Sequence, residues 1–237
     1  MENTYLVSRT GNQVWNSFVR TLPTALTLVP VAMLCGVLAA QSGWGFVEVL
    51  FYSALGFSGS GQLALLPLAG QELGVLTMLL MAVSINSRYI PIAFATTSRL
   101  PSAGLPRAIT AHMLGDEAYA VESEQDATSS IITIRLTIYV AWVLSNIAGA
   151  FLIFLIPHWL ANPGVNLGFP ASAVLFVLSL GQLKARVSRI NATWNRRVVE
   201  IAVCVLVAMG LFMLVGKVWF WLPSIAFSTW RMWRIKA

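Results

Sequence analysis

Arg88 lies in a stretch of the chain that is long and apolar enough to cross a membrane. It is the one charge in residues 75–97, VLTMLLMAVSINSRYIPIAFATT. A charge in hydrocarbon costs about 2.5–3.5 kcal/mol on insertion scales, so it normally faces a polar cavity or a partner. Asn86, Ser87 and Tyr89 give it polar neighbours. We expect Arg88, with Asn86 and Tyr89, to recognise an anionic group. The alternative is an arginine that extends roughly 13 Å to the lipid headgroups.

A run of small polar residues interrupts the apolar segment 46–69. Residues 56–62, GFSGSGQ, contain three glycines and two serines. Each interior glycine weakens a helix by roughly 1 kcal/mol, and Pro67 weakens it again. We expect a broken helix or re-entrant loop, as in many transporter sites, and the alternative is close helix packing through small residues. The residues of this run expected to contact a substrate are Gly59, Ser60, Gly61 and Gln62.

Asp116 and Glu117 lie in a weakly apolar segment, residues 108–121. This length is short for a span and suits a re-entrant or partly buried helix. His112 and Asp116 are four residues apart and are predicted to share one helix face. We expect Asp116 or Glu117 to hold an ammonium group or to carry protons, since apolar surroundings raise the pKa of a carboxyl. The alternative is a solvated acidic turn, above all for residues 122–126.

The composition is that of a membrane protein. Of the 237 residues, 57% are hydrophobic and 10% are charged, whereas soluble domains have about 25% charged residues. The mean hydropathy is +0.76. We expect an all-α, polytopic membrane protein in the lipid bilayer, forming a single integral membrane domain over residues 1–237. About five to seven transmembrane helices are expected, with at least one broken or re-entrant segment.

The positive charges lie mostly between the apolar segments. The densest cluster, in residues 184–197, is expected to be a cytoplasmic loop by the positive-inside rule. We expect residues 1–20 to be a cytoplasmic tail, a helix to start near Pro23, and residues 217–237 to be a tryptophan-rich, basic tail. The expected uninterrupted spans are residues 22–40, 136–156, 169–183 and 198–216.

The side on which Arg99 and Arg107 lie depends on two segments. If residues 46–69 and 108–121 both re-enter the membrane, these arginines fall on the cytoplasmic side. If every apolar segment crosses, they fall outside. The positive-inside rule favours the first arrangement. A last span that folds back near Pro223 would bring the basic C-terminus to the cytoplasmic side as well.

The chain lacks the motifs of the common catalytic classes. It has no nucleophile elbow, Walker loop, zinc-protease motif or glycine fingerprint. Cys35 and Cys204 lie inside apolar segments, and no pair of residues has metal-ligand spacing. The net charge of +6 forms no basic stripe with aromatic residues. We therefore expect no enzyme activity, no cofactor, no metal site and no nucleic-acid partner.

Three motifs in order resemble those of a known family. They are Gly59-Ser60-Gly61-Gln62, Asn86-Ser87-Arg88 and Asp116-Glu117-Ala118-Tyr119, and LPTALTLVPVAMLCGVLA precedes them. They are similar to the AzlC-type branched-chain amino acid permeases, the large subunits of the LIV-E exporters, over about residues 13–183. Tyr89 stands where many members have histidine, and Gly168 where aspartate is frequent. The tryptophan-rich end matches poorly, which affects substrate identity more than fold.

The resemblance implies a transporter in the bacterial inner membrane. It implies export of leucine, isoleucine and valine, with methionine as a further candidate, together with a small AzlD-type membrane subunit. From the residues we expect Arg88 to hold the carboxylate, coupling to an ion gradient and a cytoplasmic N-terminus. The alternatives are a non-transporting assembly subunit, which the tryptophan-rich tail would suit, or an exporter of another small zwitterion or organic acid.

Overall fold

The computed structural model describes residues 2–68, 74–155, 176, 180, 193–216 and 219–236. The chain forms two compact units, which are described separately. Unit 1 contains Met1–Gln71 and Asn86–Ala171, and unit 2 contains Glu72–Ile85 and Ser172–Ala237. Apart from residues 176 and 180, the span predicted at 169–183 lies outside the described residues, as does most of the basic loop predicted at 184–197.

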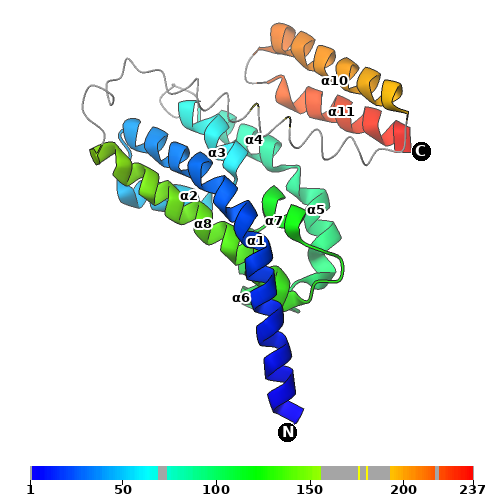
Figure 1. Ribbon diagram of the computed structural model, residues 1–237. Helices are drawn as coiled ribbons and strands as arrows, with labels where there is room; N and C mark the ends of the chain where they lie inside the picture. The colour runs from blue at the N-terminus through cyan, green and yellow to red at the C-terminus, as the bar shows by residue number, and fades with distance from the viewer. Residues whose placement is uncertain are drawn as a thin grey trace. The chain divides into compact units, whose positions relative to one another are not determined.

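All regular structure in the described ranges is helical (Figure 1). Three of the described helical stretches are long and apolar enough to cross a membrane. They are Asn12–Gln41, Thr128–Ile153 and Trp194–Val215, and two shorter apolar helices are Phe46–Leu55 and Val75–Asn86. The prediction of an all-α, polytopic membrane protein is confirmed.

Unit 1 is built on two long helices that run in the same direction, α1 (Glu2–Gln41) and α8 (Thr128–Leu155) (Figure 1). Arg20, near the middle of α1, pairs with Asp126, just before the start of α8. Further along, a Cβ added to Gly36 would lie 1.9 Å from the backbone oxygen of Asn146. Small residues let two membrane helices approach this closely. Because α1 and α8 are parallel, both begin at the same end of unit 1.

Both helices start earlier than the sequence predicts. α1 is continuous from Glu2 and carries Pro23 and Pro30 inside it, so a helix start at Pro23 is wrong. Proline costs a helix about 3 kcal/mol, but membrane helices tolerate it where neighbouring groups satisfy the freed carbonyl. α8 begins at Thr128 rather than 136, because Arg135 does not mark a membrane boundary but is fully buried inside the helix bundle.

The segment 46–68 is broken and folds back on itself. It forms α2 (Phe46–Leu55), α3 (Gly59–Leu65) and the short 3-10 helix η1 (Leu66–Leu68). Tyr52 donates its hydroxyl to the carbonyl of Gln62, and the Gln62 amide donates to the carbonyl of Tyr52. In a continuous helix these residues would be about 15 Å apart. The predicted interruption is confirmed, and residues 56–58 form the bend.

The stretch predicted as one helix at residues 75–97 is two helices. α4 (Val75–Asn86) ends before Ser87 and Arg88, and α5 (Tyr89–Thr96) leads into the 3-10 helix η2 (Thr97–Arg99). Pro91 has no N–H to donate to the Ser87 carbonyl four residues earlier. That carbonyl instead accepts from the backbone N–H of Ile90 at 3.1 Å. The break therefore falls one turn before the proline.

The segment 104–121 also folds back. It forms α6 (Gly104–His112) and α7 (Asp116–Val121), so His112 and Asp116 do not share a helix face as predicted. The chain turns at 113–115, where Gly115 has an extended backbone. Arg135 on α8 bonds both the Thr110 carbonyl and the Glu122 carboxylate. One helix would separate those two partners by about 18 Å.

The two folded-back segments enter unit 1 from opposite ends and meet at their bends. His112, at the end of α6, lies 2.7 Å from the carbonyl oxygen of Ala54, at the end of α2. Phe57 packs against the buried cluster of Ala118, Ile134 and Ile138. Arg99 and Arg107 lie at the end of unit 1 where α8 begins. The side of the membrane on which they lie stays a prediction.

Unit 2 contains a helical hairpin, α10 (Trp194–Val215) and α11 (Trp221–Lys236). Arg231, late in α11, pairs with Glu200, early in α10, so the two helices are antiparallel. Residues 221–236 of the predicted tail are thus helical and return toward the start of α10. The predicted basic loop, residues 184–197, therefore overlaps the first turn of α10 at Trp194.

Candidate functional site

Three helix interruptions meet inside unit 1, and we call them the break junction: residues 56–58, 87–88 and 113–115. Ser58 donates a 2.6 Å hydrogen bond to the side-chain oxygen of Asn86, which joins the first interruption to the second. Arg88 pairs with Asp116, which joins the second to the third. Each predicted motif therefore lies at, or directly after, one of the interruptions.

Arg88 is the central charge of the break junction. Its Nε lies 3.1 Å from Oδ2 of Asp116, and the two side chains are 24% and 9% exposed. Its Nη2 donates to the Tyr89 hydroxyl at 2.8 Å, and its guanidinium carbon lies 4.8 Å from the centre of the Tyr89 ring, within the range of a cation–π contact. Arg88 is thus held by protein groups and does not reach out toward lipid headgroups alone.

The glycine–serine run is shaped by close packing as well as by polar groups. A Cβ on Gly59 would lie 2.9 Å from the Trp142 ring, and one on Gly61 would lie 2.8 Å from the Ser58 hydroxyl. The Ser58 hydroxyl also accepts from the backbone N–H of Gly61 and so caps α3. Both alternatives drawn from the sequence, packing and polar contact, therefore apply to this run.

Gln62 is buried, and both ends of its amide are bonded inside the protein. Its nitrogen donates to the Tyr52 carbonyl, and its oxygen accepts from the indole N–H of Trp142 at 2.8 Å. These bonds fix α3 against α2 and α8. A substrate contact through the Gln62 side chain stays a prediction, and it would use the second N–H or the second lone pair of the amide.

The hydroxyl of Ser60 is buried and has no hydrogen-bond partner among the described residues. A buried polar group without a partner costs about 1–3 kcal/mol. Such groups in a native fold call for an explanation, and a ligand or water that supplies the missing bond is one. Ser60 is therefore the member of the run whose polar group is available in this conformation.

The two acidic residues of α7 have different environments. Asp116 carries the contact with Arg88, while burial raises the pKa of the Glu117 carboxyl above its ordinary value. α7 lies outside the three candidate membrane spans. The neutral form of Glu117 consequently persists to higher pH than that of an exposed glutamate. Asp116 can then face Arg88 as the negative charge while Glu117 holds an exchangeable proton.

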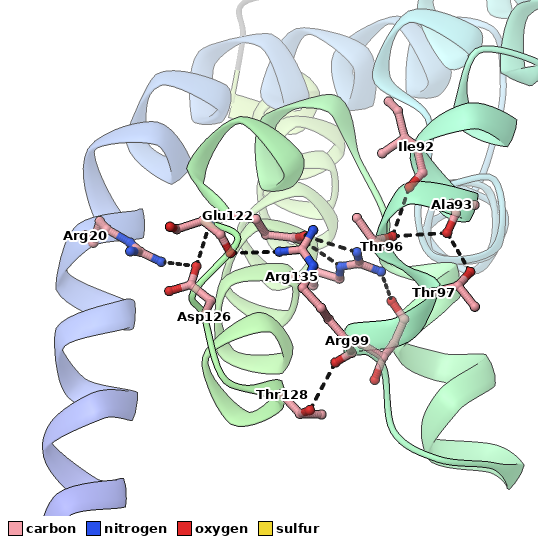
Figure 2. A network of polar contacts seen from close by, with 12 residues as sticks. Arg20, Ile92, Ala93, Thr96, Thr97, Arg99, Glu122, Asp126, Thr128 and Arg135 are labelled. Atoms are coloured by element: carbon pink, nitrogen blue, oxygen red, sulfur yellow. Dashed lines mark hydrogen bonds and ion pairs between the residues drawn. The ribbon is translucent and has the colours of Figure 1, made fainter.

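A second group of charges, which we call the charged end, lies where α8 begins, beside the middle of α1. It consists of Arg20, Arg99, Glu122, Asp126 and Arg135, and Figure 2 shows how these side chains point toward one another. Nε of Arg135 lies 2.7 Å from Oε1 of Glu122, and both side chains are 0% exposed. Arg99 approaches the same carboxylate at 3.5 Å.

Sequence reasoning missed the role of Arg135 and Glu122. Arg135 was placed at the edge of a span, and Glu122 in a solvated turn, but the two form a buried ion pair. The available signal was Thr128-Ser129-Ser130, a run typical of a helix start, seven residues before Arg135. Among the described residues, no three histidine, cysteine, aspartate or glutamate side chains cluster closely enough to hold a metal ion.

Comparisons with known proteins agree with the membrane architecture. The sequence model of the AzlC protein family matches residues 23–156. A protein of Archaeoglobus fulgidus named "uncharacterized membrane protein" is 32% identical over 173 residues, which cover 71% of this chain and 75% of that protein. A Helicobacter pylori protein of the same name is 22% identical over 218 residues, or 90% of this chain and 93% of that protein. No solved structure matches.

Proposed function

The chain belongs to the AzlC family of membrane proteins, and from this premise and the geometry of the break junction we propose that it exports small neutral amino acids. Branched-chain amino acids are the proposed substrates, with methionine as a further one. The observation that carries the proposal is the meeting of the three predicted motifs at three helix interruptions. Interrupted helices near the membrane midplane are a common form of transporter substrate site.

The pairing of Arg88 with Asp116 favours a zwitterionic substrate. A ligand with only a carboxylate would draw Arg88 away from Asp116, whose side chain is 9% exposed. Removing one partner of a buried pair costs about 3–5 kcal/mol. An amino acid offers both charges, so its carboxylate can take Arg88 while its ammonium takes Asp116. No charge is then left uncompensated.

The remaining groups of the break junction suit the same ligand. The Ser60 hydroxyl lacks a partner among the described residues, so it is free to bond a substrate carboxylate or ammonium that reaches it. Asn86 and Tyr89 already contact Ser58 and Arg88, so they can follow Arg88 when it changes partner. In this scheme Gly59 and Gly61 let the backbone of α3 lie close to Trp142 and Ser58, and Gln62 holds α3 in place.

We also propose how the protein is oriented in the membrane. We place the charged end on the cytoplasmic side of a bacterial inner membrane, because Arg20, Arg99 and Arg107 lie there and basic residues favour that side. The N-terminus of α1 is then cytoplasmic. A small AzlD-type membrane subunit is proposed as the partner on the basis of the family resemblance.

The substrate class is tested by transport of leucine and of its two single-charge analogues. Efflux from preloaded cells is compared for empty vector, this chain alone, and this chain with its small partner. We expect efflux of leucine, valine and methionine, and no efflux of isocaproate, which lacks the amine, or isoamylamine, which lacks the carboxylate. Export of isocaproate as fast as leucine would contradict the zwitterion assignment, and no efflux of any compound would contradict the export proposal.

Coupling to protons is proposed through Glu117. Because its raised pKa favours the neutral form, protonation of Glu117 occurs at higher pH than for an exposed glutamate. In vesicles containing the complete transporter, an imposed pH gradient should drive leucine accumulation by the wild type. Glu117→Gln should lose this accumulation and keep exchange of labelled for unlabelled leucine. Equal accumulation by both proteins would exclude Glu117 as the proton carrier.

A further inference from the structure

A cavity of about 350 Å³ lies beside the break junction, within unit 1. Binding cavities for small molecules usually measure about 300–1,000 Å³, so this one suits a ligand of amino-acid size. Its polar lining comes from Ser58, Asn86, Tyr89 and His112. Its apolar lining includes Leu55, Phe57, Ile90, Ala93, Ala111 and Leu114.

The cavity is connected to the charged pair by Tyr89 and Asn86. Tyr89 lines the cavity, and its hydroxyl accepts the hydrogen bond from Arg88. Asn86 also lines it and is bonded to Ser58 at the first interruption. A zwitterion held between Arg88 and Asp116 therefore has an adjoining space with polar groups nearby and mostly aliphatic or aromatic walls.

We propose that this cavity receives the apolar side chain of the transported amino acid and that Ala93 limits the length of that side chain. The inference rests on the proposed function, because it needs a zwitterion at Arg88 and Asp116. Ala93 follows Tyr89 by four residues on α5, so both lie on one face of the helix and both line the cavity. Ala111 belongs to α6, on another wall.

The small size of Ala93 leaves room that a larger residue would fill. Leucine at this position adds three carbon atoms to the cavity wall one helical turn from Tyr89. A single methylene of misfit changes selection by about 10- to 200-fold in apolar pockets. Ala93→Leu should therefore discriminate against long substrates and still admit alanine, whose side chain is one methyl group.

The test compares leucine and alanine efflux in the complete transporter, at matched expression. Ala93→Leu should lower leucine efflux at least about tenfold more than alanine efflux. The control is Ala95→Leu, since Ala95 is exposed on the same helix and does not line the cavity. It should leave the ratio of leucine to alanine efflux unchanged. An equal fall for both substrates in Ala93→Leu would overturn the proposal.

A second variant enlarges the cavity in case Ala93→Leu does not fold. Ile90 also lines the cavity, so Ile90→Ala should increase the efflux of methionine relative to valine. Unchanged preference in a well-folded Ile90→Ala protein would overturn the proposal. Wild-type protein that exports no neutral amino acid would refute the proposed function and this inference together. Wild-type export with unaltered selectivity in both variants would refute this inference alone.

Discussion

Arg88→Ala is expected to abolish leucine efflux while the protein still reaches the membrane. The substitution removes the group proposed to bind the substrate carboxylate, and with it the positive charge beside Asp116, whose side chain is 9% exposed. Removing one partner of a fully buried ion pair costs about 3–5 kcal/mol. Because Arg88 is 24% exposed, we expect a smaller cost of about 2 kcal/mol here. Since 1.4 kcal/mol is a factor of ten, efflux at subsaturating leucine should fall by at least about thirtyfold.

The controls separate the charge of Arg88 from its shape. Arg88→Lys keeps the charge but loses the planar guanidinium that can bond a carboxylate through two nitrogens, so we expect it to restore only part of the efflux. Arg196→Ala, at an exposed position on α10, should transport as the wild type does. Size-exclusion chromatography would be used to check that each variant is folded. Unaltered leucine efflux by a folded Arg88→Ala protein would refute the proposed substrate site.

An exchange of the two charges gives a further check on the same pair. Arg88→Asp with Asp116→Arg keeps both charges at the break junction and reverses their positions. If the pair served only to hold α5 against α7, the exchanged protein would transport normally. If the pair recognises an oriented zwitterion, the exchanged protein should fold and transport poorly.

The sequence predicts the site residues better than it predicts their contacts. Arg88, Asp116 and Glu117 were selected because charge is costly at membrane depth, and this argument needs no partner. The pairing of Arg88 with Asp116 joins positions 28 residues apart in sequence. It depends on which helix interruptions meet in the fold. The interruption at 56–58 was predictable from its density of glycine and serine. That at 87–88 was missed, although Pro91 lies one turn after it.

The charged end could not be predicted because position relative to a span does not determine burial. Arg135 has apolar residues on its C-terminal side and serines and threonines on its N-terminal side, as expected of a residue at a membrane boundary. Its burial depends on the return of α7, which brings Glu122 to it. The fold-back of a short helix depends on tertiary contacts, and the local sequence indicates it only weakly. From its sequence neighbours alone, Glu122 therefore resembles a loop residue.

Glu122→Ala is expected to destabilise unit 1 by about 3–5 kcal/mol. The variant leaves the guanidinium of Arg135, which is 0% exposed, with the Thr110 carbonyl as its remaining bond at 3.0 Å. Arg99 keeps the Ser123 carbonyl but also loses its nearest carboxylate. Two positive charges close together would then face a buried space with no anion. The expected result is a large fall in melting temperature in detergent, measured by size-exclusion chromatography after heating.

Asp126→Asn is the matched control at the same end of the protein. Asp126 pairs with Arg20, and their side chains are 12% and 43% exposed. A solvent-accessible pair of this kind is worth about 1 kcal/mol or less, and asparagine can still accept the hydrogen bond from the backbone N–H of Ser123. This variant should therefore melt close to the wild type. Equal melting temperatures for Glu122→Ala and Asp126→Asn would show that burial of Arg135 and Glu122 does not control the stability of this end.

Removing both members of the buried pair distinguishes pairing from packing. Glu122→Leu with Arg135→Leu deletes both charges and keeps apolar volume, a change that is often neutral in other proteins. We expect this double variant to be more stable than Glu122→Ala, because the fully buried Arg135 charge is removed together with Glu122. Arg99, whose side chain is 19% exposed, loses the Glu122 carboxylate in both variants. If the double variant is as unstable as Glu122→Ala, the ion pair itself holds the fold-back of α7. That fold-back also places Asp116 opposite Arg88, so leucine efflux should then fall with stability.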